Sequence, residues 1–155
     1  MRSIIEIGIA VLLAYIAYQN YKINFANSRV QKDKLRLDLF DRRHRIFRAS
    51  QELFATVVRE GALTQKALFK FSADSSDSEF LFGEEIKDYI SEIYKRGVKL
   101  IYINERLNDR SLKVGDERSK LAHENSELLK WFGDQFEVSR EKFRKYLHFT
   151  IYKFD

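Results

Sequence analysis

The chain has 155 residues and a mass of 18.5 kDa, which allows one ordinary domain or a smaller domain with an appendage. It has no Pro, six Gly, 33% charged and 45% apolar residues, which excludes collagen-like and largely disordered chains. The lack of Cys excludes a disulfide framework, a thiol nucleophile and Cys-ligated metal sites. This length without any Pro favours long helices.

Residues 1–21 are predicted to form a transmembrane anchor. Fifteen of these 21 residues are apolar, and Glu6 is the only acidic one. A helix from Ser3 to Tyr21 is ~28 Å long, close to the ~30 Å hydrocarbon core of a bilayer. Tyr15 and Tyr18 fall where an interfacial aromatic belt is expected. A cleaved signal peptide, a buried core helix and an amphipathic interfacial helix fit this pattern less well.

The charges that flank this segment predict its orientation. Five basic residues follow the segment closely: Lys22, Arg29, Lys32, Lys34 and Arg36. The N-terminal flank carries only Arg2. By the positive-inside rule, the N-terminus is expected outside and the C-terminal domain in the cytoplasm. Residues 22–32 are predicted to be a juxtamembrane linker.

The remaining chain, residues 33–150, is predicted to be a cytoplasmic helical bundle with a short tail at 151–155. Apolar residues recur every seven positions, which is typical of amphipathic helices. The predicted helices cover residues 33–60, 65–71, 84–107 and 116–149. The fold class is therefore all-α, an N-terminal transmembrane helix followed by an antiparallel bundle of three long helices and one short helix. The heptad spacing also permits intermolecular coiled-coil pairing.

Single residues mark the ends and turns of these predicted helices. Gly61 is expected to end the first helix, and Thr64 to cap the short one. Asp116 is predicted as the cap of the last helix. The Ser- and Asp-rich stretch 72–79 is predicted to be an exposed loop. Gly97 lies in the middle of a helix, which indicates close packing or a bend.

A cluster of basic residues follows the apolar segment. Its eight members are Arg29, Lys32, Lys34, Arg36, Arg42, Arg43, Arg45 and Arg48. Only three acids lie among them, so this stretch carries +5, the net charge of the whole chain. Beside a membrane these residues are candidates for contact with anionic lipid headgroups, or they serve only to set topology. Nucleic acid is a third and less favoured partner, because no aromatic platforms alternate with the cations.

The sequence predicts no enzyme, no cofactor and no metal site. It has no Gly-rich phosphate loop and no nucleophile motif. His123 and Glu127 share a helix face, but such a pair is only half of a metal site and is better explained as surface pairing. His44 lies among arginines, a setting that suits neither a cation site nor a general base.

Two segments resemble a group of uncharacterised bacterial single-span membrane proteins with helical domains. The first is LDLFDRR at residues 37–43, and the second is FLFG-x-x-I at residues 80–86. Trp131-Phe132 followed by Gln135-Phe136 also resembles this group. The resemblance implies an inner-membrane setting and a helical cytoplasmic domain, and it assigns no functional residue.

These observations lead to one main functional hypothesis and two alternatives. The main hypothesis is a non-catalytic, membrane-tethered helical module that binds a protein partner or a second copy of itself. The first alternative is an effector that perturbs the bilayer by oligomerisation. The second alternative is a membrane-associated nucleic-acid binder.

Overall fold

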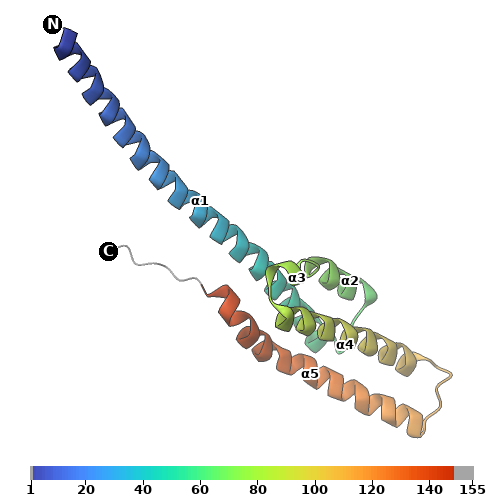
Figure 1. Cartoon of the computed structure of the whole chain (residues 1–155). Coiled ribbons are helices and arrows are strands. Elements are labelled where there is room, and N and C mark those ends of the chain that lie inside the picture. Colours follow the sequence, from blue (N-terminus) through green and yellow to red (C-terminus); the bar gives the residue numbers. More distant parts are fainter. Residues whose placement is uncertain (1, 149–155) are drawn as a thin grey trace. The chain divides into compact units, whose positions relative to one another are not determined.

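A computed structural model describes the backbone of residues 2–148 and the side chains of residues 6–148. Figure 1 shows the five helices, and the described residues contain no strand. In chain order the helices are α1 (Arg2–Glu60), α2 (Gln65–Asp74), α3 (Ser78–Leu81), α4 (Glu84–Asn108) and α5 (Asp116–Leu147). The predicted all-helical class is confirmed. The predicted tail at 151–155 lies outside the described residues.

The chain divides into two compact units, residues 1–39 and residues 40–155. Residues 22–32, predicted to be a juxtamembrane linker, belong to α1, so the helix runs through them without interruption. Between Gly8 and Gly61 the sequence has neither Gly nor Pro, the residues that interrupt helices most strongly. The polar residues near Asn24 cost only a few tenths of a kcal/mol each in a helix, so they do not end it.

Residues 1–39 contain only the N-terminal part of α1. Among the described residues, no helix combines the length and apolar composition needed to cross a membrane. The predicted span at 1–21 is therefore not confirmed, and the side chains of its residues 1–5 lie outside the described part. From Ile7 to Leu37 the large apolar side chains of this unit are exposed to solvent.

In residues 40–155 the end of α1 packs antiparallel to α5. Phe47 contacts Phe143 with ring centroids 5.5 Å apart, and Phe54 contacts Phe132 at 6.2 Å. Gln51 lies between these contacts and donates an Nε2 hydrogen bond of 2.6 Å to Ser139 Oγ. The seven-residue spacing therefore placed the buried face of this part of α1 correctly. The helix ends where predicted, at Gly61, whose φ of 63° suits glycine.

Helices α4 and α5 form the second antiparallel pair of this unit (Figure 1). Their contacts run in opposite order, from Glu85 with Lys142 to Arg106 with Glu117. Between these ends, Tyr89 donates a 3.1 Å hydrogen bond to Gln135 Oε1 in the core. Burial raises the pKa of the Tyr89 hydroxyl, so it stays protonated and remains a donor.

Helix α2 packs on α4 where Gly97 leaves room for it. A Cβ atom at Gly97 would lie 2.7 Å from Leu68 Cδ1 and 3.1 Å from Leu63 Cδ2, so the predicted close packing is confirmed. Thr64 caps α2 as predicted, because its side chain accepts a hydrogen bond from the Ala67 amide. At the start of α5 the N-cap is Gly115, and Asp116 is the first helical residue instead of the predicted cap.

The prediction of an exposed loop at 72–79 is wrong in part. Helix α2 continues to Asp74, and a second short helix, α3, begins at Ser78. Ser75 and Ser78 are buried, and the Ser75 hydroxyl donates a 2.7 Å hydrogen bond to the Phe71 carbonyl. A serine whose hydroxyl donates to a backbone carbonyl one turn earlier can be buried, although the composition of the stretch is polar.

Candidate functional site: the basic segment of α1

All eight basic residues predicted as a site lie on α1, but they fall into both units. Arg29, Lys32, Lys34 and Arg36 belong to residues 1–39, and Arg42, Arg43, Arg45 and Arg48 belong to residues 40–155. Seven of the eight are exposed, and Arg43 is half-buried. The eight residues are therefore mostly exposed, with one exception that has a structural role.

The four residues of the first unit form a strongly basic stretch. All four are exposed. Arg36 lies 3.8 Å from Asp33, which is the only acid in this stretch. Upstream, the Lys22 ammonium lies 5.3 Å from the centroid of the Tyr18 ring. Aromatic and basic side chains therefore meet where the apolar part of α1 gives way to its charged part.

Arg43 is held within the second unit by contacts with distant residues. Its Nε donates a 2.9 Å hydrogen bond to the Leu81 carbonyl. Its guanidinium lies 5.7 Å from the Phe82 ring centroid and 5.5 Å from the Tyr146 ring centroid. These contacts join α1 to the end of α3 and to α5. The Arg43 side chain is thus a stabilising contact of the bundle.

We expect Arg43→Ala to lower the free energy of unfolding by about 1–2 kcal/mol. The variant loses one hydrogen bond and the contacts of the cation with two rings. Arg45→Ala is the matched control, because Arg45 is exposed and forms no ion pair with any described residue; its expected cost is below about 0.5 kcal/mol. Denaturant unfolding followed by Trp131 fluorescence measures both. Equal costs for the two variants would contradict this role for Arg43.

Arg45 and Arg48 line an open groove between α1 and α2. The groove has a volume of about 310 Å³. Its lining residues are Asp41, His44, Arg45, Arg48, Ala49, Glu52, Lys70 and Asp74. Neither Arg45 nor Arg48 forms an ion pair within the described part of the chain. Two guanidinium groups at the edge of the groove thus remain available to an anionic group.

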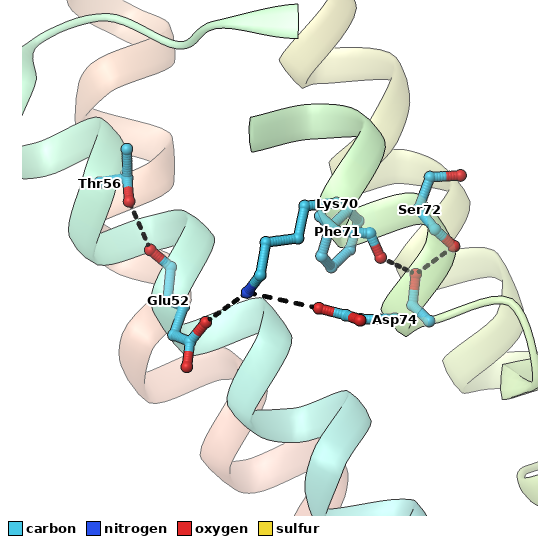
Figure 2. A network of polar contacts seen from close by, with 7 residues as sticks. Glu52, Thr56, Lys70, Phe71, Ser72 and Asp74 are labelled. Carbon is cyan, nitrogen blue, oxygen red and sulfur yellow. Dashed lines mark hydrogen bonds and ion pairs between the residues drawn. The ribbon is translucent and has the colours of Figure 1, made fainter. Parts of the chain in front are cut away.

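The other cation of the groove, Lys70, is engaged. Figure 2 shows its ammonium between two carboxylates, 2.9 Å from Glu52 Oε2 and 3.4 Å from Asp74 Oδ2. The hydrogen bond to Glu52, with the charges of both carboxylates, raises the pKa of the Lys70 ammonium. Lys70 therefore pairs with two carboxylates of the groove, and the cations and acids that line the groove are equal in number. No sequence pattern indicates this groove, because Lys70 is 18 residues from Glu52.

The histidines form no metal site with other described residues. No group of three or more His, Cys, Asp or Glu side chains that could hold a metal is present in the described part. His123 lies 3.9 Å from Glu127, and both side chains are exposed, consistent with surface pairing. His44 stacks on Phe40 at 5.6 Å and contacts Phe47 at 6.2 Å, so its ring extends the aromatic face of α1.

A second open pocket, of about 320 Å³, lies over α2, α3 and α4. Five serines line it: Ser72, Ser75, Ser76, Ser78 and Ser91. Its one cation, Lys87, already pairs with Glu79 at 3.9 Å and Glu84 at 3.8 Å. Sequence analysis missed this pocket, because it treated residues 72–79 as an exposed loop. The pocket lacks an unpaired charged group with which to hold a ligand.

Comparison with known proteins adds no assignment. No protein-family model matches the chain, and neither the curated proteins nor the solved structures give a match. The resemblance of residues 37–43 and 80–86 to a bacterial membrane group therefore stays a prediction.

Proposed function

We propose that this chain is a non-catalytic, membrane-anchored helical module. In this proposal the N-terminal part of α1, residues 1–21, inserts into the lipid bilayer as a single span. The basic residues that follow contact anionic headgroups, and residues 40–155 serve as an interaction domain. The anchor confines that domain to the membrane surface, which raises its effective concentration for partners there.

The exposed apolar surface of α1 is the observation that carries the proposal. Val11, Leu12 and Leu13 are each about 60% exposed, and they are consecutive in the helix. Because successive residues point 100° apart, these three side chains, with Ile7 and Ile16, leave no polar face on this stretch. A helix that is apolar all round is typical of a protein core or a membrane. A single partner helix covers only one face of such a helix, and lipid covers the faces that remain.

The residues at the end of this apolar stretch suit a membrane–water interface. Tyr15, Tyr18 and Tyr21 are exposed and follow each other at intervals of three. Tyrosine prefers the headgroup region, where its ring is in an apolar medium and its hydroxyl is hydrated. At the other end the apolar run of the sequence begins at Ile4, before the described side chains. Glu6 lies near that end, within reach of the opposite headgroups.

The basic surface supports both orientation and headgroup contact. Arg29, Lys32, Lys34 and Arg36 follow the apolar stretch within 15 residues of Tyr21, the range in which the positive-inside rule acts. This favours a cytoplasmic position for residues 40–155. Each cation near an anionic surface contributes about 1 kcal/mol to attraction.

Fractionation of cells that express the full chain tests this proposal. We expect the protein to stay with the membranes after a high-salt wash and to leave them only in detergent. Protease added to spheroplasts is expected to spare residues 40–155. Recovery in the aqueous fraction without detergent contradicts the proposal. Release by salt together with salt-dependent retention on nucleic acid supports a nucleic-acid binder instead, and depolarisation of the cells supports a membrane-perturbing effector.

A further inference from the structure

A stripe of aliphatic side chains runs along the part of α1 that belongs to residues 1–39. Its members are Ile9, Ile16, Ile23, Val30 and Leu37, spaced seven residues apart. Each is about half exposed, between 46% and 55%, so no described element covers the stripe. Four of the five are β-branched. We propose that this stripe is the pairing face of a parallel, in-register, two-stranded coiled coil formed with a second copy of the chain.

The length and the residue types of the stripe favour this occupant. The stripe spans four heptads, the length over which a coiled-coil pattern is sustained, and position a is apolar in each of them. If its members are heptad positions a, β-branched side chains at a favour two parallel strands. In that arrangement each residue of the stripe packs against the same residue of the second chain. An α-helix has 3.6 residues per turn, so a strict seven-residue repeat drifts slowly around it. This drift produces the left-handed supercoil of such dimers.

The intervening d positions explain why the second copy must be parallel. These positions hold Leu12, Gln19, Ala26 and Asp33. In an antiparallel pair, a residues pack in layers with d residues, so the β-branched side chains would meet Gln19 and Asp33. In a parallel pair, the β-branched a layers stay separate from the d layers of Gln19 and Asp33. Two copies anchored in one membrane also run in the same direction, and this last argument alone rests on the proposed function.

Pairing places opposite charges at the d layer of Asp33, which is the most polar of these layers. Asp33 is the only acid between Arg29 and Arg36. At position d its side chain packs among residues of the second chain that include Lys34, at position e. Lys34 is exposed and forms no ion pair with described residues of its own chain. Pairing therefore places each Asp33 beside a lysine of the other copy, and this offsets part of the repulsion between the two carboxylates.

Single cysteines in the full chain test the pairing face directly, because the native sequence has none. Ile23→Cys and Val30→Cys are expected to give disulfide-linked dimers under mild oxidation in detergent micelles. Phe25→Cys and Leu35→Cys are the matched controls, because these exposed apolar residues lie at positions c and f, away from the face. They are expected to form no disulfide-linked dimer, because their side chains point away from the second chain. Equal cross-linking at all four positions, or none at Ile23→Cys and Val30→Cys, overturns the proposal.

Association constants from sedimentation give a second readout. Leu37→Lys is expected to weaken dimerisation at least about tenfold, since a charged residue at a core position costs stability. Leu35→Lys, at position f, is expected to leave dimerisation unchanged, and Asp33→Leu is expected to strengthen it. Circular dichroism verifies that each variant remains helical. Equal effects of Leu37→Lys and Leu35→Lys overturn the proposal.

Membrane fractionation of the same samples separates this proposal from the anchor. Chains that stay with the membrane but do not cross-link retain the anchor and refute the pairing face. Chains that leave the membrane but still cross-link at Ile23→Cys and Val30→Cys retain the pairing face and refute the anchor.

Discussion

Replacing Phe54 with alanine is expected to lower the free energy of unfolding of residues 40–155 by about 3–5 kcal/mol. Phe54 is fully buried at the centre of the α1–α5 contact. Its ring lies 6.2 Å from that of Phe132 and 5.8 Å from that of Phe136. Truncation removes apolar burial and both ring contacts, and it leaves a cavity that the surrounding helices fill only in part. The loss is a large share of the 5–15 kcal/mol typical of a domain.

Phe69→Ala is the matched control for this experiment. Phe69 is a residue of the same type in the same unit, but its side chain is 63% exposed. We expect its replacement to change the free energy of unfolding by less than about 0.5 kcal/mol. Trp131 is the only Trp of the chain, and its ring packs 5.0 Å from that of Phe132, so its fluorescence follows this core. Similar losses for Phe54→Ala and Phe69→Ala would show that the described packing is wrong.

Periodicity and single turn residues were sufficient to predict most of the helical architecture. The seven-residue spacing of Ile86, Ile93 and Leu100 predicted the buried face of α4 because one face of a helix recurs with that period. Gly61 and Thr64 act as predicted, since helix ends depend on local backbone chemistry. Contacts of these kinds lie within a few residues, where sequence patterns are informative.

Polar composition marks neither an interruption of α1 nor an exposed loop throughout residues 72–79. Residues 22–32 are helical because moderately weak helix formers do not end a helix that lacks Gly and Pro. Ser75 and Ser78 are buried within a stretch predicted to be an exposed loop. A serine hydroxyl that bonds to the preceding turn satisfies itself locally, so its polarity does not require exposure.

The candidate site was predictable as a charged surface but not as individual contacts. Its eight basic residues are adjacent in sequence, and seven are exposed. The exception, Arg43, bonds to the Leu81 carbonyl 38 residues away. The groove beside Arg45 and Arg48 likewise depends on Lys70 of another helix. Such long-range neighbours follow from helix packing and leave no pattern in the sequence.

Lysines introduced into the apolar stretch of α1 are expected to prevent stable membrane insertion. The double variant Val11→Lys/Leu13→Lys places two charges on exposed apolar positions of this stretch. Each lysine near the centre of a bilayer costs about 2.5–3.5 kcal/mol, so two together reduce partitioning by more than about a thousandfold. Neither position belongs to the aliphatic stripe that starts at Ile9, so the change leaves the proposed pairing face intact.

Leu35→Lys/Val58→Lys is the matched control for this variant. It adds the same two charges at exposed apolar positions outside residues 1–21. We expect it to partition like the native chain. Equal release of both double variants would show that added charge alone, and not its position in the apolar stretch, controls partitioning.

The flotation of purified full-length protein with uncharged lipid vesicles tests membrane insertion most directly. At about 1 M salt the Debye length falls to ~3 Å, so attraction between exposed charges and headgroups is screened. We expect the native chain to float with these vesicles, while Val11→Lys/Leu13→Lys remains in the aqueous layer. A native chain that stays in the aqueous layer, or that floats only with anionic vesicles at low salt, contradicts insertion of the N-terminal part of α1.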